Sequence, residues 1–280
     1  MTPDKIALNT VSLRFENFEA TINAAADAGF KSVELPLGHL KTDLAKGWTL
    51  ERMRALIQQR GLTVCGGFDG QLRTFASSAS VKASHDDLVK NAEMIAFFGG
   101  KTMVAGTDYV NWPGPNEYPD ALGSIAESIG TLADRIRPLG ISILIEFNWG
   151  AVKSLLGAAE IARRSGRPNV GVLFDIAHVH CTPTKLEHLT AGIVPYIHHV
   201  HVDNMPAKPS ETTNCNSDRV LPGDPRGIYD LPKIFGTLAA HGYRGSYAIE
   251  MFSDELWALP PAEAAKRCHA AMKTIFPLLN

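Results

Sequence analysis

The sequence has few of the features that mark secreted, membrane or nucleic-acid-binding proteins. Its four cysteines are scattered and form no CxxC pair, which argues against a disulfide framework and a structural zinc knuckle; they are Cys65, Cys181, Cys215 and Cys268. No apolar run is long enough to cross a bilayer, and residues 1–10 lack a basic and then apolar leader. We therefore expect a reducing, cytoplasmic compartment.

An excess of charge of one sign is also missing. The chain carries 27 Lys and Arg residues against 29 Asp and Glu residues, so its formal charge is −2. Such a balance gives no general attraction to nucleic acid or to an anionic membrane surface. We expect neither as a partner, and the sequence leaves the oligomeric state open, a homo-oligomer included. Hydrophobic residues make up 45% of the 280 residues, enough for a substantial core without disulfides.

Short β-rich runs alternate with amphipathic helical stretches along the whole chain. The eight candidate strands are residues 6–13, 31–37, 62–68, 101–106, 141–148, 170–178, 197–204 and 245–252. Helices are expected at residues 17–29, 49–61, 84–100, 118–140, 185–192 and 260–276. Eight alternations without a break in composition predict an α/β fold, a (β/α)8 TIM barrel that forms a single domain over residues 1–280. A doubly wound sheet is disfavoured because no Gly-rich dinucleotide motif follows the first strand.

One predicted connection is unusually long. Residues 205–229 are polar and rich in Pro and Gly, and they contain no clear strand or helix pattern. Connections of this length are uncommon in compact domains, and many of them are lids or binding loops. We therefore expect an active-site loop at about residues 205–229.

The last four predicted strands each carry a metal-competent side chain near their carboxyl ends. These side chains are Glu146, Asp175, His201 and Glu250. Neighbouring parallel strands bring their carboxyl ends to one rim of a barrel, where active sites of this architecture are built. One buried carboxylate could be a satisfied structural group, but four such residues at one rim predict a metal site. Three carboxylates and one imidazole suit a single divalent metal ion, with Mn²⁺ favoured over Mg²⁺, Co²⁺ or Zn²⁺.

Such an ion would leave positions open for substrate oxygens, polarise a carbonyl and stabilise an enediolate. Asp203 lies on the same strand face as His201, and it either supports the metal site or has a buried polar role. Candidates for substrate contact surround these ligands. Asn148 could bind a hydroxyl group and Trp149 could form an apolar wall, and Glu34 and Trp112 are further candidates.

Five stretches of the C-terminal half form a recognisable pattern. They read VGVLFDIAHVH, HVHVDN, DRVLPGD, AIEMF and ELWALPPAEAA. This pattern resembles the xylose-isomerase-like sugar-phosphate isomerase/epimerase barrels, and within that family it is most similar to the inosose (2-keto-myo-inositol) isomerases. The resemblance covers the layout of nearly the whole chain and is specific from about residue 140 onward. It implies one divalent metal ion held by the four residues named above, with Glu146 and Glu250 also transferring protons on opposite sides of the substrate. It further implies substrate contacts by His178 and Arg219.

The implied reaction is isomerisation or epimerisation of a keto sugar or keto cyclitol, with inosose as the leading substrate. Ketose 3-epimerisation, inosose dehydration and cleavage of a 3-keto-glycoside would use the same residues, and the sequence does not choose among them. The stretch PGDPRGIYD is longer than the PG-x-G pattern usual in this family. The shape of the loop and the substrate range therefore stay open.

Two other classes of protein share this scaffold. Abasic-site endonucleases have the same spacing as Asp175 and His178, but they bind three zinc ions through additional histidines on early strands, and residues 62–68 and 101–106 contain no histidine. The sequence also lacks a basic stripe that could follow a phosphate backbone. A non-catalytic relative would usually have lost a metal ligand, and none of the four is missing. The sequence therefore favours an enzyme, a metal-dependent isomerase.

Overall fold

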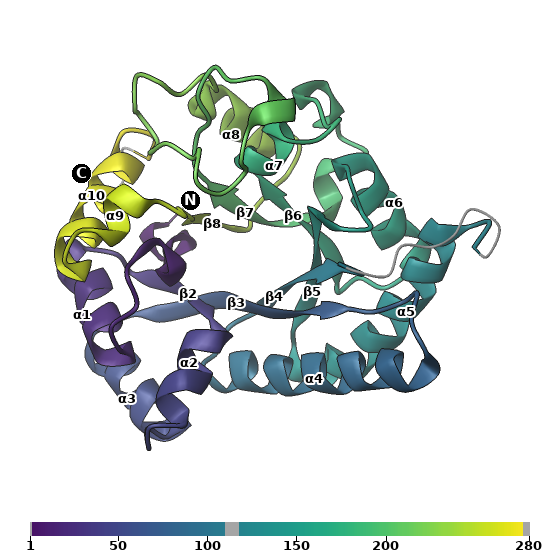
Figure 1. Ribbon diagram of the computed structural model, residues 1–280, viewed down its shortest axis with the longest axis horizontal. Helices are drawn as coiled ribbons and strands as arrows, with labels where there is room; N and C mark the ends of the chain where they lie inside the picture. Colours follow the sequence, from purple (N-terminus) through teal and green to yellow (C-terminus); the bar gives the residue numbers. More distant parts are fainter. Residues whose placement is uncertain (1, 110–117, 277–280) are drawn as a thin grey trace.

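A computed structural model describes residues 2–109 and 118–276, which form a closed barrel of eight parallel strands surrounded by helices (Figure 1). The strands are β1 (Ile6–Asn9), β2 (Ser32–Pro36), β3 (Thr63–Leu72), β4 (Thr102–Thr107), β5 (Ser142–Gly150), β6 (Val170–Asp175), β7 (Ile197–Val202) and β8 (Ser246–Ile249). Each strand pairs with the next in chain order, and β1 pairs with β8 to close the barrel. The predicted (β/α)8 TIM barrel is confirmed.

The barrel is covered by helices whose ends follow local sequence signals. The helices are α1 (Phe18–Ala28), α2 (Leu37–Leu44), α3 (Leu50–Gln59), α4 (Ser78–Phe97), α5 (Ala121–Ile136), α6 (Leu155–Ser165), α7 (Ile176–His180), α8 (Leu231–Ala240), α9 (Asp254–Trp257) and α10 (Pro261–Lys273). The side chain of Asn17 caps the start of α1, and Gly29, with a φ of +104°, ends it. Helices α1 and α10 pack side by side, so segments from the two ends of the chain are neighbours (Figure 1). Across the described residues, no helix combines the length and apolarity needed to span a membrane.

Several predicted strands end earlier than expected, and two of them end at a polar side chain. The first strand stops at Asn9, because its Oδ1 accepts the N–H of Val11 and the chain turns into a short 3₁₀ helix, Thr10–Ser12. The strand predicted at 170–178 stops at Asp175, because its carboxylate accepts the N–H of His178 and starts α7. His178 therefore lies on a short helix, one turn beyond the end of β6.

The helix predicted at residues 185–192 is not formed. Only two 3₁₀ turns occur in this region, Leu186–His188 and Val194–Tyr196. Gly192 and Pro195 both disfavour helix, and the remaining stretch is too short to support more than one turn by itself. Among the described residues, five helices lie outside the predicted ranges: α2, α6, α7, α8 and α9.

The alternation of side chains along the strands separates the barrel interior from the layer of helices. In β5, Ile143 and Ile145 belong to the large hydrophobic cluster that includes the helices, whereas Leu144 packs with Val104 of β4 and Leu173 of β6 in a separate small cluster. The side chains of this small cluster, Val104, Leu144 and Leu173, face the interior of the barrel. Positions two residues further along each strand therefore also face the interior, nearer its carboxyl end.

The long connection predicted at about residues 205–229 is present, and Asn204 organises it (green in Figure 1, beside α7 and α8). The backbone of Asn204 pairs with Val220 in an isolated bridge. Its Oδ1 accepts the N–H groups of Met205 and Tyr229, and its Nδ2 donates to the carbonyl of Tyr229. One side chain thus ties both ends of the loop together, and this holds Arg219 above the barrel.

Candidate active site

The interior positions of the last four strands bring the predicted metal ligands to one end of the barrel. Glu146 and Asp175 lie two positions beyond the interior leucines of β5 and β6. His201 pairs in register with Asp175, and Glu250 directly follows β8. Asp175, His201 and Glu250 are buried, and the side chain of Glu146 is 16% exposed. The strand pattern alone therefore explains why these residues meet.

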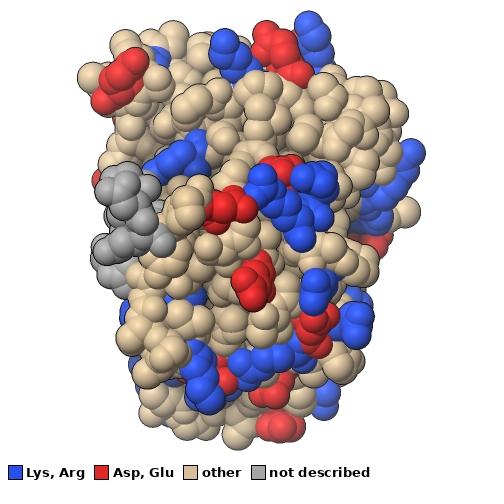
Figure 2. Space-filling view, turned by 90° about the vertical axis from the view of Figure 1, so that its right-hand side faces the viewer, with Lys and Arg blue, Asp and Glu red and all other residues tan. Residues whose placement is uncertain are grey.

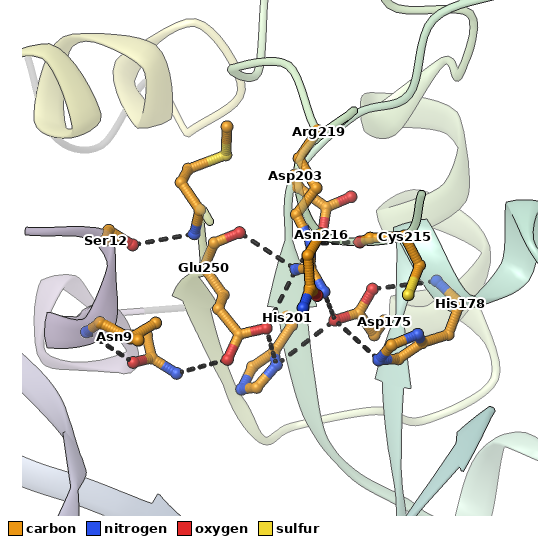
Figure 3. A network of polar contacts seen from close by, with 12 residues as sticks. Asn9, Ser12, Asp175, His178, His201, Asp203, Cys215, Asn216, Arg219 and Glu250 are labelled. Carbon is orange, nitrogen blue, oxygen red and sulfur yellow. Dashed lines mark hydrogen bonds and ion pairs between the residues drawn. The ribbon is translucent and has the colours of Figure 1, made fainter. Parts of the chain in front are cut away.

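Asp175, His201 and Glu250 form a tight cluster (Figure 3). Nδ1 of His201 lies 3.1 Å from Oε2 of Glu250 and 3.5 Å from Oδ2 of Asp175. One ligand atom from each of the three residues lies within 4.8 Å of the other two. This spacing suits coordination of a single cation, so three of the four predicted ligands lie around one point.

Glu146 joins this cluster through Asp175. It forms a second group of potential ligands with Asp175 and His178, and its Oε1 lies 3.1 Å from Nε2 of His178. Burial raises the pKa of Glu146, and the opposing effect of His178 does not cancel it. Asp175 is the member common to both groups, so it connects the carboxylates of Glu146 and Glu250.

Asn148 and Trp149, the predicted substrate contacts on β5, both reach the ring of His178. Nδ2 of Asn148 lies 3.1 Å from Nδ1 of the ring, and the indole Nε1 of Trp149 donates to Nε2 over 3.1 Å. Two consecutive strand residues normally point to opposite faces. Asn148 has a φ of +87°, in the left-handed region, and this strained conformation lets both side chains approach one ring.

The charges and the unpartnered atoms of the site fit a divalent cation. Five carboxylates gather here, those of Glu34, Glu146, Asp175, Asp203 and Glu250, and among the described residues Arg219 is the only Arg or Lys in an ion pair with any of them. Oδ2 of Asp175 and Nδ1 of His201 are buried without a hydrogen-bond partner in the described part of the chain. A divalent ion would coordinate both atoms and offset the excess negative charge.

Comparison with known proteins places this barrel in a family. The model of the xylose isomerase-like TIM barrels matches residues 22–275. The chain belongs to the xylose isomerase-like TIM barrel family. An inosose isomerase of Bacillus velezensis is 30% identical over 146 residues, which are 51% of this chain and 51% of that protein. Inosose dehydratase 1 of Bacillus cereus is 21% identical over 272 residues, which are 89% of this chain and 87% of that protein. The chain spans about half the length of the inosose isomerases that it matches.

Solved structures of other proteins superimpose on nearly the whole chain. A crystal structure of the IolI protein with a bound zinc atom matches with a TM-score of 0.85 at 20% identity, covering 96% of this chain and 97% of that chain. A D-allulose 3-epimerase from Methylomonas sp. in complex with D-allulose matches with a TM-score of 0.73 at 17% identity, covering 96% of each chain. At these identities the likeness shows the shared fold.

Within this xylose isomerase-like barrel, Arg219 points into the group of carboxylates (Figure 3). Its Nη1 donates to Oδ2 of Asp203 over 2.7 Å and to Oε2 of Glu250 over 3.0 Å, and its Nε donates to the carbonyl of Cys215. Nη2 lies 3.1 Å from Oδ2 of Asp175 but forms no hydrogen bond within the described residues. Most of the guanidinium therefore holds protein carboxylates. Asp203 is fully buried and accepts this hydrogen bond from Arg219, an arrangement that is compatible with both alternatives named for it, support of the metal site and a buried polar role.

The two remaining predicted substrate contacts have different outcomes. Glu34 is fully buried inside the barrel, where its Oε2 lies 2.8 Å from Nε2 of His201, so it contacts a predicted metal ligand. Trp112 lies outside the described residues. Sequence reasoning missed Asn9 and His199, which also contact Glu34. Both residues had a signal in the sequence that marks them as facing the barrel interior. His199 precedes His201 by two positions on the same strand, and Asn9 is a polar residue that ends β1 after an apolar run.

Proposed function

We propose that this chain is an isomerase or epimerase that acts on a keto sugar or keto cyclitol with one divalent metal ion, and that 2-keto-myo-inositol (inosose) is its substrate. The observation that carries the proposal is the arrangement around Asp175, which joins the carboxylates of Glu146 and Glu250 in two adjoining groups of buried ligand atoms. Membership of the xylose isomerase-like family and the match to an inosose isomerase support the same reaction class.

Four residues are the proposed ligands of the metal ion: Glu146, Asp175, His201 and Glu250. When bound, the ion would act as a Lewis acid that polarises the substrate carbonyl and acidifies the neighbouring C–H bond. The zinc in the IolI structure and the unpartnered atoms Oδ2 of Asp175 and Nδ1 of His201 support a divalent ion. The oxygen-rich set favours Mn²⁺ over a softer metal ion.

Glu146 and Glu250 are the proposed proton carriers. Burial raises the pKa of Glu146, which makes its carboxylate a stronger base toward a proton on carbon than an ordinary glutamate. Glu250 accepts hydrogen bonds from Nδ2 of Asn9 over 2.9 Å and from Nη1 of Arg219 over 3.0 Å, and these two donors fix the direction in which its carboxylate points. An α-hydroxy ketone is isomerised when one carboxylate removes the proton from the hydroxyl-bearing carbon and a proton returns to the former carbonyl carbon. The hydroxyl proton passes to the former carbonyl oxygen in the same conversion.

The proposed substrate contacts surround this pair of carboxylates. His178 would bind a substrate oxygen, and Asn148 and Trp149 fix the plane of its ring. Arg219 would donate from Nη2, the guanidinium nitrogen without a hydrogen bond in the described structure. These groups bind and orient the hydroxy ketone, and the carboxylates move its proton.

A second candidate is dehydration of inosose. The match to inosose dehydratase 1 extends over 89% of this chain, whereas the match to the inosose isomerase of Bacillus velezensis covers 51% of it. Dehydration begins with loss of the same proton, followed by expulsion of a hydroxyl group from the β-carbon. Epimerisation differs only in that the proton returns to the opposite face of the same carbon.

One experiment separates these reactions. The protein is treated with chelator, reloaded with Mn²⁺ and incubated with 2-keto-myo-inositol in D₂O, and the products are followed by NMR. Isomerisation moves the carbonyl with deuterium uptake, epimerisation inverts one deuterated carbon, and dehydration removes a hydroxyl-bearing carbon signal. Absence of both metal binding and deuterium uptake would contradict the proposal.

Variants then test the proton carriers. We expect Glu146→Gln and Glu250→Gln each to lower kcat by about 10²–10⁴-fold, because each removes a proton-transfer group. The matched control is Glu127→Gln on the exposed face of α5, which should turn over like the wild type. Wild-type turnover by both site variants would show that other groups move the proton.

A further inference from the structure

We propose that Glu34 is a positioning residue that fixes the tautomer of His201, so that Nε2 carries a proton and Nδ1 is the nitrogen that binds the metal ion. The inference rests on the metal site proposed above. Glu34 comes from β2, whereas the four proposed ligands lie on or next to strands β5 to β8. It has no role in the proton transfer described above.

The two nitrogens of His201 have different surroundings. Nε2 lies 2.8 Å from Oε2 of Glu34, a hydrogen-bond distance, whereas Nδ1 faces Oε2 of Glu250 and Oδ2 of Asp175 without a hydrogen-bond partner in the described structure. An ionised carboxylate only accepts, so the hydrogen bond to Glu34 requires a proton on Nε2. In the neutral ring Nδ1 then carries the lone pair, which points toward the other proposed ligands.

Asn9 holds Glu34 in place. Its Nδ2 donates to Oε2 of Glu34 over 3.1 Å and to Oε1 of Glu250 over 2.9 Å, one bond for each amide proton. Its Oδ1 accepts the N–H of Val11 over 3.1 Å, and this bond fixes which end of the amide faces the carboxylates. Glu34 and Glu250 are therefore held by one side chain, and His201 lies in contact with both.

His199 offers a competing interpretation. Its Nε2 lies 3.3 Å from the same Oε2 of Glu34, and Glu34, His199 and His201 could together hold a second cation. That arrangement would require both nitrogens of His201 to lose their protons if Nδ1 also binds the first ion. A proton shared between His201 and Glu34 needs no such loss. The geometry therefore favours the positioning role, and a second ion becomes a result that would overturn it.

The first test reads the tautomer directly. The wild-type protein is loaded with Zn²⁺, which is diamagnetic, and the ring nitrogens of its histidines are observed by ¹⁵N NMR while bound zinc is counted by elemental analysis. We expect one ion per chain, a protonated Nε2 on His201 and a coordinated Nδ1. A deprotonated Nε2, or a second tightly bound ion, overturns the proposal.

The second test measures Zn²⁺ affinity by competition with a chelator. Glu34→Ala should weaken binding by about 10- to 100-fold, as loss of a group that orients a ligand does elsewhere, and Glu34→Gln should lose less because its amide oxygen still accepts from Nε2. The matched control is Asp43→Asn, because Asp43 is equally buried but accepts the N–H of Phe18 at the start of α1. This control should lower Tm and leave the affinity for Zn²⁺ unchanged.

The outcomes separate the two proposals. If the wild type binds no metal ion, the proposed function fails. If the wild type binds one ion and turns over substrate but Glu34→Ala binds Zn²⁺ as tightly as the wild type, only the role of Glu34 is wrong. If Glu34→Ala does not fold, the ¹⁵N measurement on the wild-type protein still shows whether Nε2 of His201 carries a proton.

Discussion

Trp149 donates its indole N–H to Nε2 of His178 over 3.1 Å. An indole N–H can only donate, so this hydrogen bond requires that Nε2 carries no proton. Burial also disfavours a charged ring, but Asp175 and Glu146 outweigh it and raise the pKa of His178 to about 10. Protonation of Nε2 and the hydrogen bond from Trp149 therefore exclude each other, and the indole limits how readily His178 takes up a proton.

Replacement of Trp149 should make His178 easier to protonate. In Trp149→Phe the neutral ring loses a hydrogen bond of about 0.5–1.5 kcal/mol, so the pKa of His178 should rise by about half a unit to one unit. The measurement is an NMR titration of the metal-free protein. Trp48→Phe is the control, because Trp48 packs on Phe18 and Arg52 away from this ring. An unchanged or lower pKa would show that the indole does not control His178.

Arg219→Gln should destabilise the metal-free protein more at neutral pH than in acid. The ion pair with Arg219 helps to hold the pKa of Asp175 far below its ordinary value of 3.8, although burial opposes this. A lowered carboxyl pKa contributes stability that is fully present above the ordinary value and is lost progressively as the pH falls from that value toward the lowered pKa of the folded state. We expect the free energy of unfolding to drop by about 3–5 kcal/mol at pH 7 and by less near pH 2, inside the window between the ordinary and the lowered pKa of Asp175.

Urea unfolding at the two pH values checks this expectation. The control is Arg267→Gln, since Arg267 and its partner Glu263 are exposed on α10 and should contribute less than about 1 kcal/mol. Equal losses at both pH values for Arg219→Gln would mean that packing, and not charge, explains its effect.

Metal binding should stabilise the folded chain in a concentration-dependent way. When Mn²⁺ is added back to chelator-treated protein, the free energy of unfolding should rise by about 2.7 kcal/mol at a concentration 100 times the Kd, because the ion binds only the folded site. His201→Ala should abolish the effect, and His241→Ala, at the end of α8, should keep it. Differential scanning calorimetry with and without Mn²⁺ measures this; the same Tm increase in His201→Ala would place the ion elsewhere.

The thiol of Cys215 should react before the other cysteines. A hydrogen bond from Cys181, together with His178, lowers the pKa of Cys215 to about 5 in spite of burial, whereas burial raises that of Cys268 to about 12. Cys215 is then mainly a thiolate above about pH 5 and a thiol below it. We expect iodoacetamide to label Cys215 first at pH 6–7, as read by mass spectrometry of peptides. A labelling rate that rises only near pH 8–9 would contradict the lowered pKa.

The barrel and the polar residues near the carboxyl ends of its last strands could be predicted, because both depend on local patterns. Alternating apolar runs separated by amphipathic helices led to eight strands, and polar residues at the ends of apolar runs led to Asp175, His201 and Glu250. The same patterns could not show that Asp175 also caps α7, because the apolar run continues past it to residue 177. That capping hydrogen bond is what moves His178 from a strand to a helix.

The rest of the site depends on contacts between distant segments. Glu34 was predicted as a candidate for substrate contact near the end of a strand, but nothing near it in the sequence indicates that its partner is His201, 167 positions away. The left-handed φ of Asn148 had no local signal either, because asparagine adopts both normal and left-handed conformations and the residue was read as part of a regular strand. The carboxylate partners of Arg219 could not be predicted either, because they depend on the hydrogen bonds by which Asn204 holds the two ends of the long loop together.

The hydrogen bond from Asn9 to Glu250 crosses the seam where the first strand meets the last. All four proposed ligands belong to the half of the chain that begins with β5, whereas Asn9 and Glu34 belong to its first two strands. A separately produced C-terminal half-barrel would thus carry the coordinating groups without those that align them. Metal affinity could then report on reassembly when the two halves are mixed.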